Sequence, residues 1–137
     1  MKNHIYLRAY MAGVTVPTVL LVFVLASFVV LRFVYHVPIL IERGLVFPLA
    51  IVPGLWGLWN MLYVVVRGHW RIPLGVHGAL VPLFVGPLAL YNAFLLGFDI
   101  PRFALALFPP GVAIAMLAYY LVWKYLVGFL NRLLEVG

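Results

Sequence analysis

The side chains able to carry out chemistry are few and lie mostly at the ends of apolar stretches. The acidic residues are Glu42, Asp99 and Glu135, each expected at or beyond a helix end, so paired-carboxylate catalysis is not supported. Ser27 is the only serine, and no histidine is expected at its depth to complete a serine triad. The chain has no cysteine, which excludes thiol chemistry and thiolate metal sites. We therefore expect neither an enzyme nor a metal site.

His77 is the histidine best placed to hold a cofactor. It lies in the sequence GVHG, where Gly75 and Gly78 would leave room for a flat macrocycle beside an axial imidazole. A transmembrane haem normally takes a second histidine at matching depth, but His36 is expected at the opposite side of the membrane. A haem- or pigment-binding subunit is thus one alternative. The other is that the histidines bond to headgroups or loops at the membrane surface.

Two apolar stretches share a pattern of proline and asparagine. GLVFPLAIVPGLWGLWN and GALVPLFVGPLALYN each carry two prolines five residues apart and end on an aromatic residue followed by asparagine. Pro53, Pro82 and Pro87 are predicted to kink their helices, because a proline in a helix interior removes a hydrogen bond and clashes with the preceding turn. The freed carbonyls either line a path for an ion or solute or simply accompany kinks that shape a bundle.

Asn60 and Asn92 are the costly polar residues of these stretches, because an amide in hydrocarbon needs a protein or water partner. Counted at about 1.5 Å per residue, their depths differ by more than about 10 Å, so they should not meet within one chain. Each is predicted to form an interhelical hydrogen bond. The alternative is a permeation path shared with Thr15 and Thr18; Ser27 is the remaining hydroxyl of the first apolar stretch.

Long apolar helices must position these residues. The chain has 137 residues, of which 67% are hydrophobic and 9% charged, with a mean hydropathy of +1.18. Four uncharged stretches of 23, 23, 27 and 21 residues lie between Arg8 and Arg32, Arg43 and Arg67, Arg71 and Asp99, and Arg102 and Lys124. A helix crosses the ~30 Å hydrocarbon core with about 20 residues. We predict an all-α polytopic membrane protein of one domain, 1–137: four transmembrane helices in an antiparallel bundle, at 10–33, 45–66, 76–98 and 103–127.

Two other architectures are excluded, and the charges suggest an orientation. A soluble bundle would need a polar stripe on each helix, and a barrel would need alternating segments; neither pattern is present. One side of the predicted topology carries Lys2, Arg8, Arg67, Arg71, Lys124 and Arg132, and the other carries Arg32, Arg43 and Arg102. The positive-inside rule then places both termini in the cytoplasm, in a membrane of the bacterial inner-membrane type. The cations behind the net charge of +6 are expected to contact phospholipid headgroups at the helix ends and not to bind nucleic acid.

Small residues indicate which helices pack closely. Asp99 to Arg102 is a short turn that predicts an antiparallel hairpin of the last two helices. Spacings of four predict one contact between two small-residue stripes, which are Ala89, Ala93 and Gly97 on one helix and Gly111 and Ala115 on the other.

These features favour a non-catalytic membrane protein that acts through helix association, as an accessory subunit or a homo-oligomer. Its expected partners are the lipid bilayer and either other membrane subunits or further copies of the chain. A small channel or transporter is one alternative, with a path lined by polar residues and proline-freed carbonyls. The haem- or pigment-binding subunit that uses His77 is the other.

Overall fold

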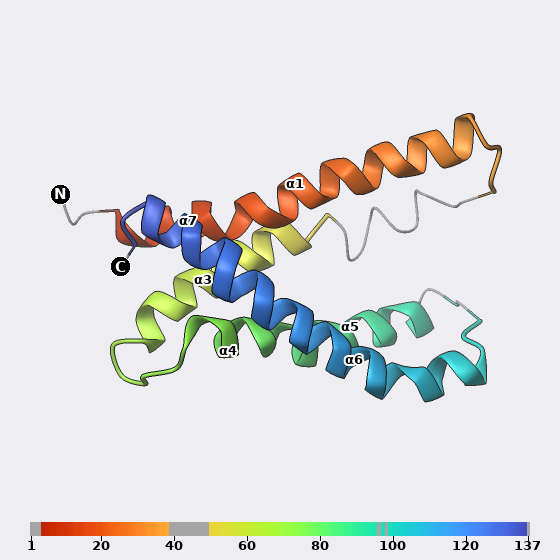
Figure 1. The fold of residues 1–137 in the computed structure, drawn as a ribbon. Coiled ribbons are helices and arrows are strands. Elements are labelled where there is room, and N and C mark those ends of the chain that lie inside the picture. Colours follow the sequence, from red (N-terminus) through yellow and green to blue (C-terminus); the bar gives the residue numbers. More distant parts are fainter. Residues whose placement is uncertain (1–3, 39–49, 96, 98, 137) are drawn as a thin grey trace. The chain divides into compact units, whose positions relative to one another are not determined.

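All regular elements in the described part of the chain are helices (Figure 1). The structure is a computed structural model that describes residues 4–38, 50–95, 97 and 99–136. The helices are α1 (Ile5–Phe33), α3 (Val52–Val66), α4 (Leu74–Ala79), α5 (Val81–Leu95), α6 (Arg102–Val122), the π-helix η2 (Trp123–Val127) and α7 (Gly128–Leu133). The predicted all-α class is confirmed for these residues.

Three helical stretches are long and apolar enough to cross a membrane: Ile5–Phe33, Leu74–Leu95 and Arg102–Leu133. They correspond to three of the four predicted spans. The remaining prediction, 45–66, lies partly outside the described residues, and α3 within it has 15 residues. A helix of that length measures about 22 Å, less than the ~30 Å core. The fourth crossing and the four-helix bundle therefore stay predictions, as does the placement of Glu42.

The chain divides into two compact units where the sequence predicted one domain. The first comprises Met1–Val65 with Asn131–Gly137, and the second comprises Val66–Leu130. Each unit has its own set of buried residues.

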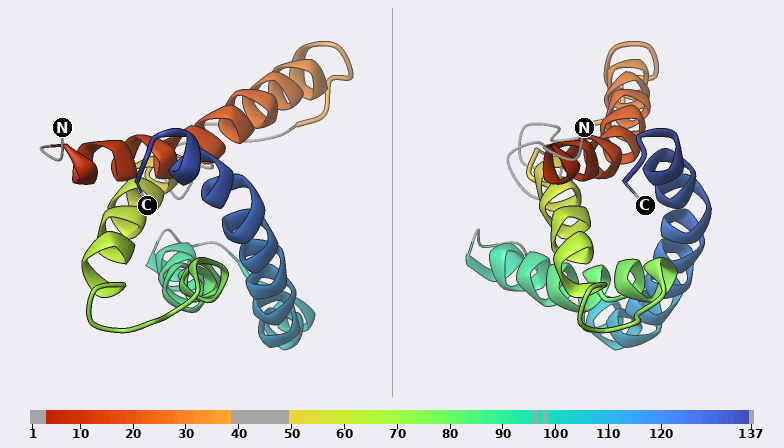
Figure 2. Two further views of the ribbon diagram at one scale, coloured as in Figure 1. Left: turned by 60° about the vertical axis from the view of Figure 1, so that its left-hand side comes forward. Right: turned by 90° about the vertical axis from the view of Figure 1, so that its left-hand side faces the viewer.

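In the first unit, α3 crosses the N-terminal half of α1 with their backbones in contact (Figures 1 and 2). A Cβ on Gly13 would lie 2.5 Å from the carbonyl oxygen of Trp56, and a Cβ on Gly57 would lie 2.6 Å from the ring of Tyr10. Only glycine permits this approach. The buried residues of α1 end at Pro17, and the later part of the helix exposes large apolar side chains such as Phe23. That surface is suited to lipid.

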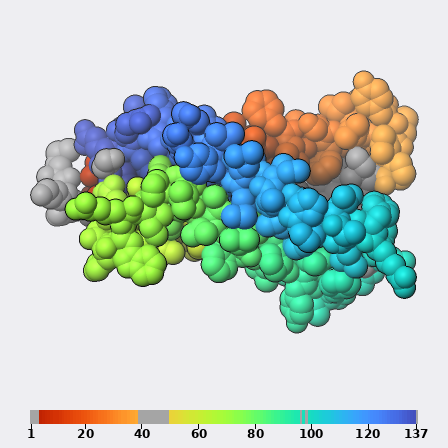
Figure 3. Space-filling model, turned by 60° about the horizontal axis from the view of Figure 1, so that its bottom comes forward, coloured from red at the N-terminus to blue at the C-terminus, as the bar shows by residue number. Residues whose placement is uncertain are grey.

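The second unit is an antiparallel helical hairpin, as the short turn predicted. Leu74, at the start of α4, lies near Gly128, whereas Gly86 in α5 faces Phe108 and Val112 of α6, so the residue numbers rise along one arm while they fall along the other. Between these ends, Gly75 faces Tyr120 and Gly78 faces Trp123. The side chains of α4 and α5 (green) run beside those of α6 (cyan to blue) in the space-filling view (Figure 3). The α4 end carries the buried side chains of this unit, whereas α6 has no buried residue over its full length.

Of the three prolines predicted to kink helices, Pro53 and Pro82 lie instead in the first turns of helices. Pro53 lies in the first turn of α3, which begins at Val52, so it starts the helix and does not kink it. The helix predicted to kink at Pro82 is interrupted at Leu80, and Pro82 lies in the first turn of α5. Pro87 is inside α5, as predicted. Pro48, the partner of Pro53 in the sequence pattern, lies outside the described residues.

Candidate functional site

Asn60 is the centre of a closed polar cluster in the first unit. Its side chain is fully buried, and its Nδ2 donates to the carbonyl of Ala9 at 2.7 Å and to Oδ1 of Asn131 at 2.8 Å. Asn131 donates back from its own Nδ2 to Oδ1 of Asn60 at 3.1 Å. The interhelical bond predicted for Asn60 is therefore present. The cluster joins α1, α3 and α7 through groups that satisfy one another, as buried amides require.

Asn131 was missed by the sequence analysis, and an unusual helix end fixes it. The amide of Val136 donates to the carbonyl of Asn131 at 2.8 Å, and the amide of Glu135 donates to that of Arg132 at 3.1 Å. Glu135 has φ 53°, the left-handed position that glycine usually fills in this Schellman ending. Its carboxylate lies 3.3 Å from Nη1 of Arg8. An exposed ion pair of this kind adds little stability, so the buried amides dominate.

The other intramembrane polar residues do not converge on a site. Each donates to the backbone carbonyl four residues earlier in its own helix: Thr15 to Met11 at 2.7 Å, Thr18 to Val14 at 2.7 Å, Ser27 to Phe23 at 2.8 Å and Asn92 to Leu88 at 2.8 Å. The interhelical bond predicted for Asn92 is thus replaced by a bond within α5. Such local bonds can satisfy a polar group on a helix surface without any partner helix.

His77 is buried in the second unit against an aromatic side chain. Its ring stands edge-on to Trp123, with centroids 6.1 Å apart and an interplanar angle of 67°. The space predicted for a macrocycle beside Gly75 and Gly78 holds the rings of Tyr120 and Trp123, so a haem there would have to displace them. Among the described residues, no group of three or more His, Cys, Asp or Glu side chains is arranged to hold a metal ion.

The π-helix η2 accounts for the position of Trp123. A π-turn is wider than an α-turn and often occurs at functional sites. Here it directs Trp123 and Val127, both fully buried, toward α4. It also leaves Lys124 exposed, with its Nζ 5.6 Å from the ring centroid of Tyr120 and 5.3 Å from that of Tyr125.

The predicted contact between two small-residue stripes is not formed at its two glycines, Gly97 and Gly111. Gly97 lies beyond the end of α5 with φ 70°, and no atom lies within 4 Å of the position of its Cβ. A Cβ on Gly111 would also meet nothing within 4 Å. The close approach of α5 to α6 occurs instead at Gly86, where a Cβ would lie 3.4 Å from both Phe108 and Val112.

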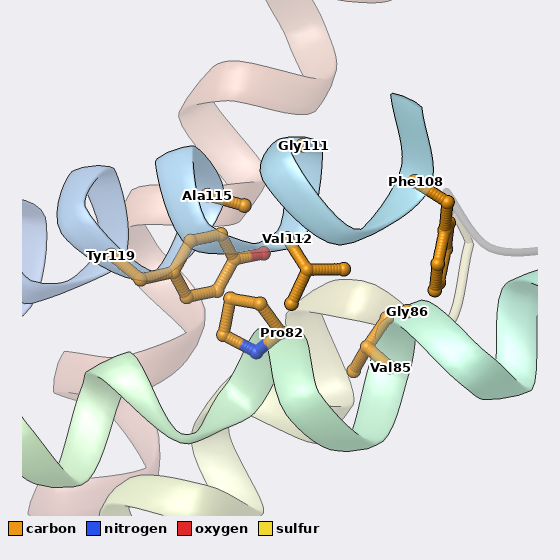
Figure 4. A pocket seen from close by; sticks show the side chains of 8 residues that line it. All are labelled: Pro82, Val85, Gly86, Phe108, Gly111, Val112, Ala115 and Tyr119. Atoms are coloured by element: carbon orange, nitrogen blue, oxygen red, sulfur yellow. The ribbon is translucent and has the colours of Figure 1, made fainter. Parts of the chain in front are cut away.

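Two apolar grooves flank this approach. The first, which we call the Tyr119 groove, has a volume of about 280 Å³. It is lined by Pro82, Val85, Gly86, Phe108, Gly111, Val112, Ala115 and Tyr119. Figure 4 shows the ring of Tyr119 extending over Pro82, with Phe108 at the other end. The second, the Met116 groove, has a volume of about 360 Å³ and is lined by Leu83, Pro87, Phe108, Pro109, Val112, Ala113 and Met116.

Neither groove offers groups for catalysis. Their linings are apolar except for the Tyr119 hydroxyl, and no acidic, histidine or serine side chain is among them. Both have the character of packing surfaces for hydrocarbon or for another helix. Comparison with protein-family models, with curated proteins and with solved structures found no match to this chain.

Proposed function

We propose that this protein is a non-catalytic integral membrane protein that works by helix association, binding another membrane protein or a second copy of itself. The surface proposed for association is the Tyr119 groove. In a bilayer, helices associate through close packing and interhelical hydrogen bonds, because lipid removes the hydrophobic driving force between them. Helix association in a bilayer therefore depends on surfaces where small residues let two backbones approach closely.

One contrast within the second unit carries this proposal. At the α4 end, the open positions beside Gly75 and Gly78 are filled by rings of the same chain, Tyr120 and Trp123. At the α5 end, no described residue occupies the equivalent space beside Gly111, and the described part of the chain leaves the groove next to it unfilled. A helix from another protomer or subunit would fill this space as the aromatic rings fill the first.

The channel alternative gains no comparable support. The hydroxyls of Thr15 and Thr18 and the amide of Asn92, which were expected to line a path, donate to the backbone of their own helices. Asn60, the remaining candidate, is fully buried, and both protons of its amide are donated within the cluster.

Photo-crosslinking in native membranes tests the association surface. Because the chain has no cysteine, a single Ala115→Cys variant can carry a benzophenone maleimide in the Tyr119 groove. Leu117→Cys is the matched control, since Leu117 is 64% exposed and two residues along a helix point in nearly opposite directions.

Irradiation should attach a protein to the Ala115 probe and not to the Leu117 probe. A mass increase of 15.4 kDa identifies a second copy, and an increase by the mass of another protein identifies a different subunit. Adducts with lipid alone at both positions would contradict the proposal.

A further inference from the structure

We propose that the Met116 groove binds one acyl chain of an anionic phospholipid whose phosphate is held by Lys124. This inference does not depend on the association proposed above, because a separate groove carries it. The two grooves share Phe108 and Val112, but Gly86 and Tyr119 line only the first, and Pro87 and Met116 line only the second.

The Met116 groove has the surface that an acyl chain needs. Leu83 and Pro87 of α5 form one wall, and Pro109, Ala113 and Met116 of α6 form the other. The lining presents apolar side chains and no charged group. A lipid tail placed there would gain dispersion contacts on both walls without leaving a polar group unsatisfied.

The flank of α6 that forms this groove leads to Lys124. Ala113, Met116, Tyr120 and Lys124 follow one another at spacings of three and four residues, which places them along one side of the helix. The ammonium group of Lys124 lies near the rings of Tyr120 and Tyr125, at the two distances given above, and cation–π contact holds a cation in this position. Aromatic rings with a polar end commonly lie at headgroup level.

The length of this flank matches one leaflet. From Lys124 to Ala113 the helix rises about 16 Å, at about 1.5 Å per residue. Half of a ~30 Å hydrocarbon core is about 15 Å. Met116, Ala113 and Pro109 precede Lys124 by 8, 11 and 15 residues, about 12, 16 and 22 Å along the helix. An acyl chain that starts from a phosphate at Lys124 would therefore enter the groove at Met116 and pass Ala113 near the middle of the bilayer, and the groove continues beyond it to Pro109.

The charge of this end of the hairpin selects an anionic headgroup. The only acidic residue in Val66–Leu130 is Asp99, in the turn at the opposite end. Arg71 lies three residues before Leu74, and a Cβ on Gly128 would lie 3.5 Å from the side chain of Leu74. Arg71 and Lys124 are therefore at the same end of the hairpin. A headgroup with net negative charge is favoured there over a zwitterionic one.

Lipid retention measured by native mass spectrometry tests the headgroup contact. The full chain is placed in nanodiscs of equal parts phosphatidylglycerol and phosphatidylcholine, released, and scored for bound lipid. We expect wild type to retain phosphatidylglycerol preferentially and Lys124→Gln to lower this retention about fivefold. Lys124→Arg and the control Arg102→Gln, at the other end of the hairpin, should retain it. Equal retention of both lipids by wild type would overturn the proposal.

A second pair of variants tests the acyl-chain contact. Ala113→Phe places a ring in the groove and should lower retention, whereas Ile114→Phe adds the same ring at a site that is 70% exposed and lines neither groove. Dihexanoyl phosphatidylglycerol, which has the headgroup but short chains, should compete poorly with the long-chain lipid. Equal losses in the two variants, or full competition by the short-chain lipid, would show that the groove takes no part.

Discussion

At the scale of single residues, the structure satisfies each intramembrane polar group named from the sequence by a short and specific bond. Asn60 could be predicted as a buried interhelical donor because an amide is costly in hydrocarbon. Its partner Asn131 could not, because the fourth span was predicted to end at residue 127 and the helix instead continues through η2 and α7 to Leu133. One signal in the sequence was the spacing of four residues between Val127 and Asn131, which places both on the same side of a helix that continues past residue 127.

The reciprocal amide pair predicts a strong coupling between two substitutions. Asn60→Leu and Asn131→Leu should each lower the free energy of unfolding by about 1–3 kcal/mol, because each leaves the other amide buried with a lost partner. The double variant should cost less than the sum, with a coupling of about 0.6–1.7 kcal/mol, as for other intramembrane hydrogen bonds. The free energy of unfolding in mild detergent is measured for the wild type, the two single variants and the double variant. Asn92→Leu, which removes a bond within α5 only, is the control, and strict additivity of the pair would refute the coupling.

At the scale of helices, glycine positions decide where elements touch. The sequence pattern predicted a contact between two small-residue stripes in the hairpin, whereas the close approach of α5 to α6 lies at Gly86, outside both stripes. It extended the helix through Gly97, whereas α5 ends at Leu95 and Gly97 takes a positive φ after it. A glycine with a proline after it is typical of a helix end, so Gly97 with Pro101 could have predicted that the helix stops before Gly97. The glycines around His77 left room for a macrocycle in one alternative, because the sequence shows that a position is small but not which side chain lies against it.

Two glycine-to-alanine substitutions separate a filled position from an open one. Gly78→Ala should destabilise the protein by about 1–3 kcal/mol, because the new methyl group would overlap the side chain of Trp123. Gly111→Ala should not destabilise it, since the space is open and alanine is the better helix former. Thermal unfolding in one detergent compares the two. Similar losses in both variants would mean that the α4–η2 contact is not as close as described.

At the scale of the whole molecule, composition alone predicted a lipid-solvated helical protein, because 67% hydrophobic residues leave no polar surface for water. The three long apolar helices agree with this prediction. The division into two units could not be foreseen, since it depends on which glycines let helices meet and not on hydropathy. Within the second unit, Arg67, Arg71 and Lys124 lie at one end and Arg102 with Asp99 lies at the other, and the positive-inside rule predicts from this that the first end faces the cytoplasm.

Cysteine labelling at the two ends of this hairpin tests most directly whether the chain crosses a bilayer as proposed. Trp70 and Asp99 are exposed, so Trp70→Cys and Asp99→Cys can each carry the single thiol of the chain. A membrane-impermeant maleimide should reach Trp70→Cys only from the cytoplasmic face, in inverted vesicles, and Asp99→Cys only from the opposite face. Labelling of both thiols from the same face would contradict a hairpin that spans the membrane. It would also contradict the two proposals that depend on this hairpin, helix association at the Tyr119 groove and acyl-chain binding at the Met116 groove.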